Sequence, residues 1–105
     1  MKVEFVRTGG VGGIRLTATL DTDVLPSEEA DRLHRLIAVA SFFDQPTSRQ
    51  SPIQGADRFQ YRVTVEDGDR IKKVEMDEPS VPEAFRPLLD YLIDSARTRR
   101  KIKRS

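Results

Sequence analysis

The chain has 105 residues, of which 37% are hydrophobic and 33% charged. This composition is typical of one globular domain with a polar surface, and it excludes a long disordered chain. The sequence contains no cysteine, which excludes disulfides and thiolate chemistry. No stretch approaches a membrane span, and the first residues hold no hydrophobic run of signal-peptide length, so we expect a cytoplasmic protein with no membrane partner.

Charge is distributed unevenly along the chain. Residues 1–96 hold 12 basic and 17 acidic side chains, whereas the last residues are strongly basic. The six cations of this end are Arg97, Arg99, Arg100, Lys101, Lys103 and Arg104. We therefore predict a single domain over residues 1–96 and a basic C-terminal tail over residues 97–105 that continues or frays a helix end.

Two strands are predicted at the start of the chain. Val3 and Phe5 alternate with charged Glu4, and a second alternating run over residues 14–20 places Leu16 and Ala18 on one face. A glycine-rich loop, Gly9 to Gly13, connects them. It leads into a strand rather than a helix and lacks the lysine of a P-loop, so we interpret it as a hairpin connection or a protein-contacting loop.

A helix is predicted from about Pro26 to Ser41. Apolar residues recur there at helical spacing, Pro26 suits a first turn, and Ser27 can serve as the N-cap. The following residues 44–56 have turn composition and no period. Loops of this length inside a compact domain are uncommon and often functional.

A β-hairpin is predicted over residues 57–76. Phe59, Tyr61, Val63 and Val65 alternate with polar residues, and Asp67-Gly68 has the composition of a tight two-residue turn. With these two residues in the turn, Glu66 would pair near Asp69, and Phe59 and Tyr61 would lie opposite Met76 and Val74.

A second helix is predicted after Pro79, with a broad apolar face and with Pro87 in its first turn, because a later proline would remove a helical hydrogen bond. The predicted order is ββαββα. We expect an α+β fold in which about four antiparallel strands carry two helices on one face.

Catalytic signals are scarce. His34 is the only histidine, so no second imidazole stands one helical turn away to share a metal ion, which argues against a zinc site. The acidic clusters at residues 21–23 and 66–69 do not continue into a calcium loop, and no serine has a G-x-S-x-G context. We therefore expect no enzyme, no metal and no cofactor.

The basic tail is the best physical case for a partner. Six cations in the tail could lie along phosphates, but the tail has no aromatic residue for stacking and the body is acidic. Nucleic acid, or another acidic partner, bound through Arg97 to Arg104 is thus the alternative function rather than the preferred one. Cations at a helix end are also common for structural reasons alone.

Several segments of the sequence resemble the emfourin family. They are the opening Met-Lys-Val-Glu-Phe, the Thr8–Ile14 glycine loop, Asp21-Thr-Asp23 with Leu-Pro before Glu-Glu-Ala, Phe42-Phe43, the run Gly-Ala-Asp-Arg-Phe-Gln-Tyr-Arg-Val-Thr-Val, and Arg86-Pro87-Leu88-Leu89-Asp90. The similarity spans about residues 1 to 93, is most specific over residues 57–65, and does not include the basic end. Emfourins are small bacterial proteins that inhibit protealysin, a thermolysin-like metallopeptidase.

The resemblance implies a reversible inhibitor that acts by inserting a loop into the peptidase cleft or by occluding it. Such an inhibitor needs a rigid scaffold and a loop with an apolar residue, and two loops here qualify. The expected contact residues are Gly10, Val11 and Gly12 in one loop, Ser51, Pro52, Ile53 and Gln54 in the other, and nearby Asp44. Contact through a sheet face remains the alternative, and the oligomeric state is left open.

Overall fold

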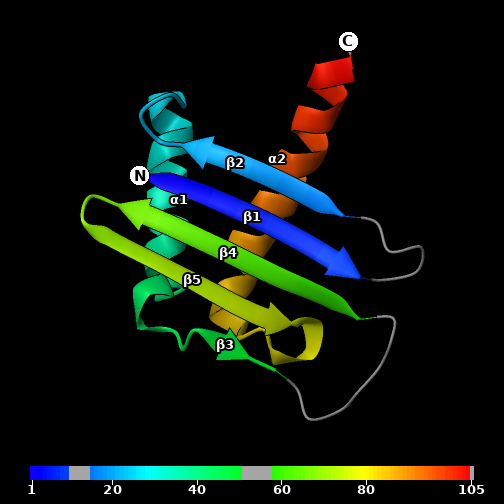
Figure 1. Ribbon diagram of the computed structural model, residues 1–105. Helices are drawn as coiled ribbons and strands as arrows, with labels where there is room; N and C mark the ends of the chain where they lie inside the picture. The colour runs from blue at the N-terminus through cyan, green and yellow to red at the C-terminus, as the bar shows by residue number, and fades with distance from the viewer. Residues whose placement is uncertain (10–14, 51–57, 105) are drawn as a thin grey trace.

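The fold consists of one β-sheet with helices packed on one of its faces (Figure 1). The computed structural model describes residues 1–9, 15–50 and 58–104, and the side chains within these ranges as far as Thr98. The α+β class is confirmed, and so is the placement of two α-helices against a mainly antiparallel sheet. The observed order is ββαβββα, because a short strand is added to the predicted set.

The sheet has five strands in the order β2-β1-β4-β5-β3. They are β1 (Lys2–Gly9), β2 (Leu16–Asp21), β3 (Ser48–Arg49), β4 (Phe59–Asp67) and β5 (Arg70–Asp77). Strand β1 pairs antiparallel with both β2 and β4, and β4 pairs antiparallel with β5. The two N-terminal strands and the long hairpin are thus joined through β1.

Strand β3 was not predicted, because it lies within the segment 44–56 that we expected to be loop. It runs parallel to β5, with Ser48 opposite Glu75 and Arg49 opposite Met76. The Glu75 amide also donates to the Thr47 carbonyl at 2.9 Å. Two residues are too few to show a period of two in the sequence, so this strand forms where the edge of β5 offers hydrogen-bonding groups.

The predicted hairpin register was wrong by two residues. Asp67 pairs with Arg70, Tyr61 lies opposite Met76, and the turn residues are Gly68 and Asp69 rather than Asp67 and Gly68. Gly68 has φ +62°, whereas Asp69 has no positive φ, which is the pattern of a type II′ turn with glycine first. The shift is even, so every side chain keeps its predicted face.

The helical segments follow the predicted positions with shorter bounds. They are α1 (Ser27–Val39), the 3₁₀ turns η1 (Phe42–Asp44), η2 (Glu78–Ser80) and η3 (Glu83–Phe85), and α2 (Arg86–Arg104). Pro87 is the second residue of α2, as predicted for a proline in a first turn. The N-cap of α1 is Pro26 rather than Ser27: its carbonyl accepts from the Ala30 amide at 2.9 Å, and no side-chain cap is formed.

The core lies between the sheet and the two α-helices. Alternate residues of the long strands point into it, together with one face of each helix. The largest fully buried side chains are Val3, Phe5, Leu33, Phe42, Val63, Val65, Val74, Met76, Phe85, Leu88, Leu89 and Leu92. The helices lie behind the sheet in Figure 1, so the opposite face of the sheet is open.

Candidate functional site

The two ends of the sheet differ in what they carry. At one end, called here the loop end, the chain leaves β1 at Gly9 and enters β2 after Arg15 and β4 after Arg58. Gly9 and Phe59 are register partners, so the segments 10–14 and 51–57 attach to the sheet at neighbouring positions. The other end, the turn end, holds the Gly68-Asp69 turn of the hairpin. The candidate site is the loop end.

Backbone packing at the loop end is close. Gly9 has φ +91°, and a Cβ atom placed on it would lie 2.2 Å from the carbonyl oxygen of Arg58. No side chain fits at that distance without a backbone shift. Glycine at position 9 therefore fixes how closely the start of β4 approaches the end of β1.

A buried ion pair fastens the start of β4 to the end of β5. The Arg58 guanidinium Nη1 lies 3.4 Å from Asp77 Oδ2, and the two side chains are only 19% and 4% exposed. Removing one member of a buried ion pair is costly, because the remaining charge loses a partner where water cannot replace it well. The ion pair thus holds the residue at which the segment 51–57 rejoins the sheet.

A second polar cluster joins the sheet to the turn before α2. The Tyr61 hydroxyl donates to Glu78 Oε2 at 2.5 Å, and Arg86 Nη1 lies 3.6 Å from the same oxygen. Burial, followed by the hydrogen bond to Glu78, raises the pKa of the Tyr61 hydroxyl well above its usual value. Tyr61 therefore stays protonated and serves as a fixed donor.

Arg7 is the cation on the core face of β1. Its guanidinium carbon lies 4.3 Å from the centre of the Phe59 ring, and its Nε atom is buried with no hydrogen-bond partner among the described residues. Sequence reasoning noticed neither this contact nor the Arg58–Asp77 pair. The available signal was the position of Arg7 in the apolar alternation of Val3 and Phe5, where a charge needs an aromatic or acidic neighbour.

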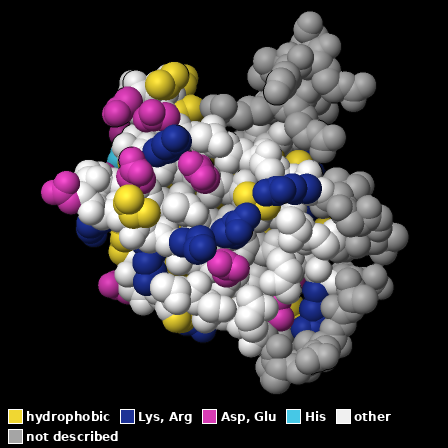
Figure 2. Space-filling model, in the orientation of Figure 1, with side chains coloured by type: hydrophobic (Ala, Val, Ile, Leu, Met, Phe, Trp, Pro, Cys, Tyr) yellow, Lys and Arg dark blue, Asp and Glu magenta, His cyan; other side chains and the backbone are white. Residues whose placement is uncertain are grey.

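The open face of the sheet adjoins the loop end. A shallow hollow of about 290 Å³ lies there, lined by residues that include Thr8, Arg15, Arg62 and Glu75. Arg62 lies opposite Glu75 in the strand register, so its positive charge is balanced by a neighbouring negative one. Figure 2 shows the same mixture over the whole face, with Lys and Arg side chains interspersed with Asp and Glu. A balanced face of this kind does not form a basic surface for nucleic acid.

The structure describes only part of the sequence-predicted contact set. Gly10, Val11, Gly12, Ser51, Pro52, Ile53 and Gln54 lie outside the described residues. Asp44 is described: it is the exposed last residue of η1 and shares a hollow with His34, Asp67 and Arg70 at the turn end. The structure therefore does not bring Asp44 together with the attachment points of the two loops.

The alternative basic site lies on α2. This helix runs to Arg104 and its last turns project past β2 (Figure 1), so all six cations belong to a helix. Arg97 is exposed, whereas the side chains of Arg99, Arg100, Lys101, Lys103 and Arg104 lie outside the described set. The last cations are thus carried on a projecting helix end.

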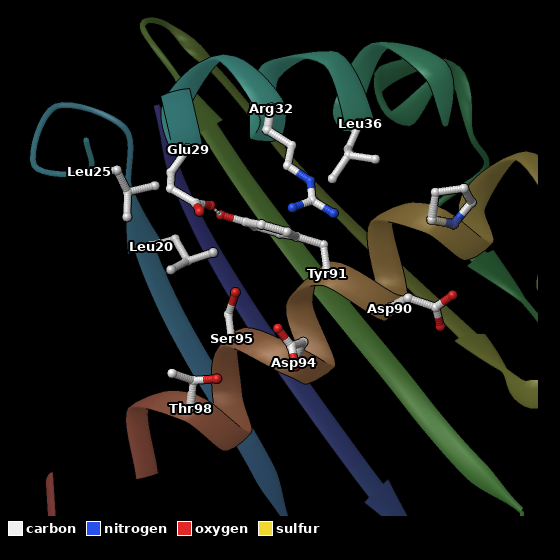
Figure 3. Close-up of a pocket in the computed structure, with 11 residues that line it drawn as sticks. Leu20, Leu25, Glu29, Arg32, Leu36, Asp90, Tyr91, Asp94, Ser95 and Thr98 are labelled. Atoms are coloured by element: carbon white, nitrogen blue, oxygen red, sulfur yellow. Dashed lines mark hydrogen bonds between the residues drawn. The ribbon is translucent and has the colours of Figure 1, made fainter. Parts of the chain in front are cut away.

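A groove of about 710 Å³ separates α1 from α2 (Figure 3). Tyr91 crosses it: its hydroxyl donates to Glu29 Oε2 at 2.7 Å, and the Arg32 guanidinium carbon lies 5.2 Å from the ring centre. Burial, and then the bond to Glu29, raises the pKa of Tyr91 to about 12. The polar groups at the centre of the groove already engage one another, so we interpret it as a helix-helix fastening.

The described ranges contain neither a candidate metal cluster nor a candidate membrane-spanning helix. No group of three or more His, Cys, Asp or Glu side chains there could hold a metal ion. Within the same ranges, no helix is both long enough and apolar enough to cross a membrane.

Comparison with known proteins identifies a family for this chain. The emfourin family model matches residues 5–93, which is most of the chain. No curated protein and no solved structure matches significantly. Family membership implies an inhibitor of protealysin-type metallopeptidases rather than an enzyme. The matched range contains the sheet except the first three residues of β1, together with α1 and the start of α2 but not the basic end, and over that range the chain belongs to the emfourin family.

Proposed function

We propose that this protein inhibits a thermolysin-like, protealysin-type zinc metallopeptidase reversibly, by placing the segments 10–14 and 51–57 in or over the active-site cleft. The observation that supports the proposal is the pairing of Gly9 with Phe59, which attaches both segments to one end of a rigid sheet. An inhibitor that presents its loops on a fixed scaffold loses less conformational entropy on binding.

The scaffold under the loops is stiff for identifiable reasons. Gly9 packs against the Arg58 carbonyl, Arg58 pairs with buried Asp77, and Tyr61 is held by Glu78. None of these groups needs to react. Val11 and Ile53 are the apolar residues that the two segments offer to the apolar subsite of the cleft, and Asp44 is no longer included because it lies at the turn end.

The test is a titration of a protealysin-type peptidase with the purified protein, following cleavage of a fluorogenic peptide after preincubation. We expect saturable inhibition without cleavage of the inhibitor. Val11→Asp and Ile53→Asp should each weaken inhibition by about a hundredfold or more, because a charge is forced into an apolar subsite.

Ile71→Asp is the matched control, since Ile71 is an apolar residue 67% exposed near the turn end. It should inhibit as the unmodified protein does. Full inhibition by both loop variants, combined with loss of inhibition in the Ile71 variant, would instead place the contact on the open face or the turn end.

Binding of nucleic acid by the projecting end of α2 is the second candidate. It is favoured by one observation, the continuation of α2 to Arg104 past the edge of the sheet. A chain ending at Thr98 should lose salt-dependent affinity for DNA or RNA if this function exists. The same truncation should leave peptidase inhibition unchanged, which separates the two candidates.

A further inference from the structure

The outer edge of β2 has no strand beside it among the described residues. Strand β2 is terminal in the sheet order, and at the other side β3 pairs only with Glu75 and Met76 of β5. The remaining edge of β5 carries Arg70, Lys72 and Lys73, charges of the kind that protect an edge. Helix α2 crosses behind β2 and its last turns project past this edge on the core side, so the helix does not lie beside β2 in the plane of the sheet (Figure 1). Exposed strand edges are templates for pairing with another strand.

The hydrogen-bond phase of β2 can be derived from its end. The Thr22 amide donates to the Met1 carbonyl at 2.9 Å, so even-numbered residues of β2 bond to β1. Thr17 and Thr19 therefore direct their backbone N–H and C=O groups outward. Both side chains are exposed on the open face, and neither is a charge or a proline of the kind that protects an edge.

This edge is complementary to itself. If two copies of β2 pair antiparallel about a two-fold axis at Ala18, Thr17 of one copy lies opposite Thr19 of the other. Both are outward-bonding residues, so the pair can exchange hydrogen bonds in both directions. The two Ala18 residues meet at the axis as a non-hydrogen-bonded pair. The Cα atoms of such a pair approach most closely, which suits a small side chain.

The same register also matches charge and apolar side chains. Arg15, which is exposed just before β2, comes opposite Asp21 of the second copy, and the match occurs twice by symmetry. Leu16 comes opposite Leu20 of the second copy on the core face. A shift by one residue would place outward-bonding groups opposite inward-bonding ones, and a shift by two would separate Arg15 from Asp21.

We propose that this protein forms a homodimer by antiparallel pairing of β2 with β2 of a second copy, centred on Ala18, with Arg15 against Asp21. Because the strands are antiparallel, the loop ends of the two copies face opposite directions. Each copy retains its own candidate peptidase site, so the dimer is a bivalent form of the protein. The proposal does not depend on the proposed function.

The interface is short, so the dimer is weak. One strand pair buries less surface than a standard stable interface, and we expect a dissociation constant on the order of 100 µM. Sedimentation velocity of the full chain over a concentration series measures it. A mass that rises from monomer toward dimer is expected, and a monomer at every concentration up to about 1 mM would overturn the proposal.

Charge reversal tests the register. Arg15→Asp and Asp21→Lys should each raise the dissociation constant about tenfold or more, since each places like charges opposite one another twice. An equimolar mixture of the two variants should dimerise again, because each then meets an opposite charge. Arg35→Asp and Asp31→Lys on the exposed face of α1 change net charge equally and should leave dimerisation unaltered.

Thr19→Pro tests the hydrogen bonds independently. The Thr19 amide points away from β1, so proline removes an outward donor while the β1–β2 ladder is preserved. We expect an unchanged melting temperature and a monomer. A Thr19→Pro variant that dimerises like the unmodified protein, or charge variants that dimerise alone and gain nothing on mixing, would overturn the proposal.

Discussion

The loop end and the turn end of the sheet contain the same kinds of contact in different surroundings. Arg7 lies 4.3 Å from the Phe59 ring centre at the loop end, and Arg70 lies 4.0 Å from that of Phe43 at the turn end. Each end also has an Arg–Asp pair at 3.4 Å, but the side chains of Arg58–Asp77 are 19% and 4% exposed and those of Arg70–Asp67 are 63% and 41% exposed.

Ion pairs of the same length at the two ends should thus contribute differently to stability, because they differ in burial. An exposed ion pair is screened by water and contributes little, whereas a buried pair that loses one member leaves an uncompensated charge. The loop end is therefore the stiffer end of the sheet, although the ion pairs at the two ends have the same length. Stiffness at this end is what a protein that presents loops to a partner requires.

The largest expected effect is at Gly9. Gly9→Ala should lower the free energy of unfolding by about 3 kcal/mol or more, because the new Cβ meets the Arg58 carbonyl and the residue has a positive φ. Urea unfolding followed by circular dichroism measures this. Gly68→Ala is the matched control at the turn end: it has φ +62° but nothing within 4 Å of the new Cβ, so only about 1–2 kcal/mol should be lost. Equal losses would show that the close approach at Gly9 is unimportant.

The next effect is at the buried ion pair. Arg58→Ala should lower the free energy of unfolding by about 2 kcal/mol, because Asp77 stays buried while one of its partners, the Arg58 guanidinium, is removed. Arg58→Ala with Asp77→Asn should recover part of the stability. A double variant no better than the single one would contradict the account.

The comparison also shows what the sequence could predict. Period-two alternation predicted the long strands, and helical spacing predicted α1 and α2, because each pattern repeats over many residues. Two features lacked such a repeat. The Arg58–Asp77 pair joins residues 19 apart in the sequence, and only the folded hairpin brings them together. Either pair of residues around Gly68 has turn composition, so the hairpin register could not be chosen from composition.

The loop segments mark the limit of the predicted site. Asp44 was grouped with them because it begins the same aperiodic stretch of sequence, yet η1 holds it at the turn end. Sequence proximity failed there because the chain between η1 and β3 runs from the turn end to the end of β5, where Ser48 and Arg49 pair with Glu75 and Met76. Residues that are assigned to a site only because they lie near it in the sequence are therefore the least reliable part of the prediction.

Alkaline pH tests the buried tyrosines. The pKa is raised by burial for both Tyr61 and Tyr91, to about 12 for Tyr91. A folded-state pKa above the unfolded value of about 10 gives stability that is fully present below pH ~10 and is lost as the pH rises through the folded pKa. Unfolding experiments across this range should show that loss. Tyr61→Phe and Tyr91→Phe should each reduce this pH-dependent loss of unfolding free energy. An unchanged dependence on pH in both variants would contradict the raised pKa values of the two tyrosines.

The smallest expected effect is at Arg70. Arg70→Ala removes an ion pair as long as Arg58–Asp77 and a cation–π contact slightly shorter than Arg7–Phe59. It should nevertheless change the free energy of unfolding by less than about 0.5 kcal/mol, because the Arg70 and Asp67 side chains are exposed. Chemical unfolding at low and high salt measures this small difference in unfolding free energy, which should disappear at high salt. A loss of unfolding free energy equal to that of Arg58→Ala would mean that the length of a contact, and not its burial, determines its contribution. The greater stiffness assigned to the loop end would then lack this physical basis.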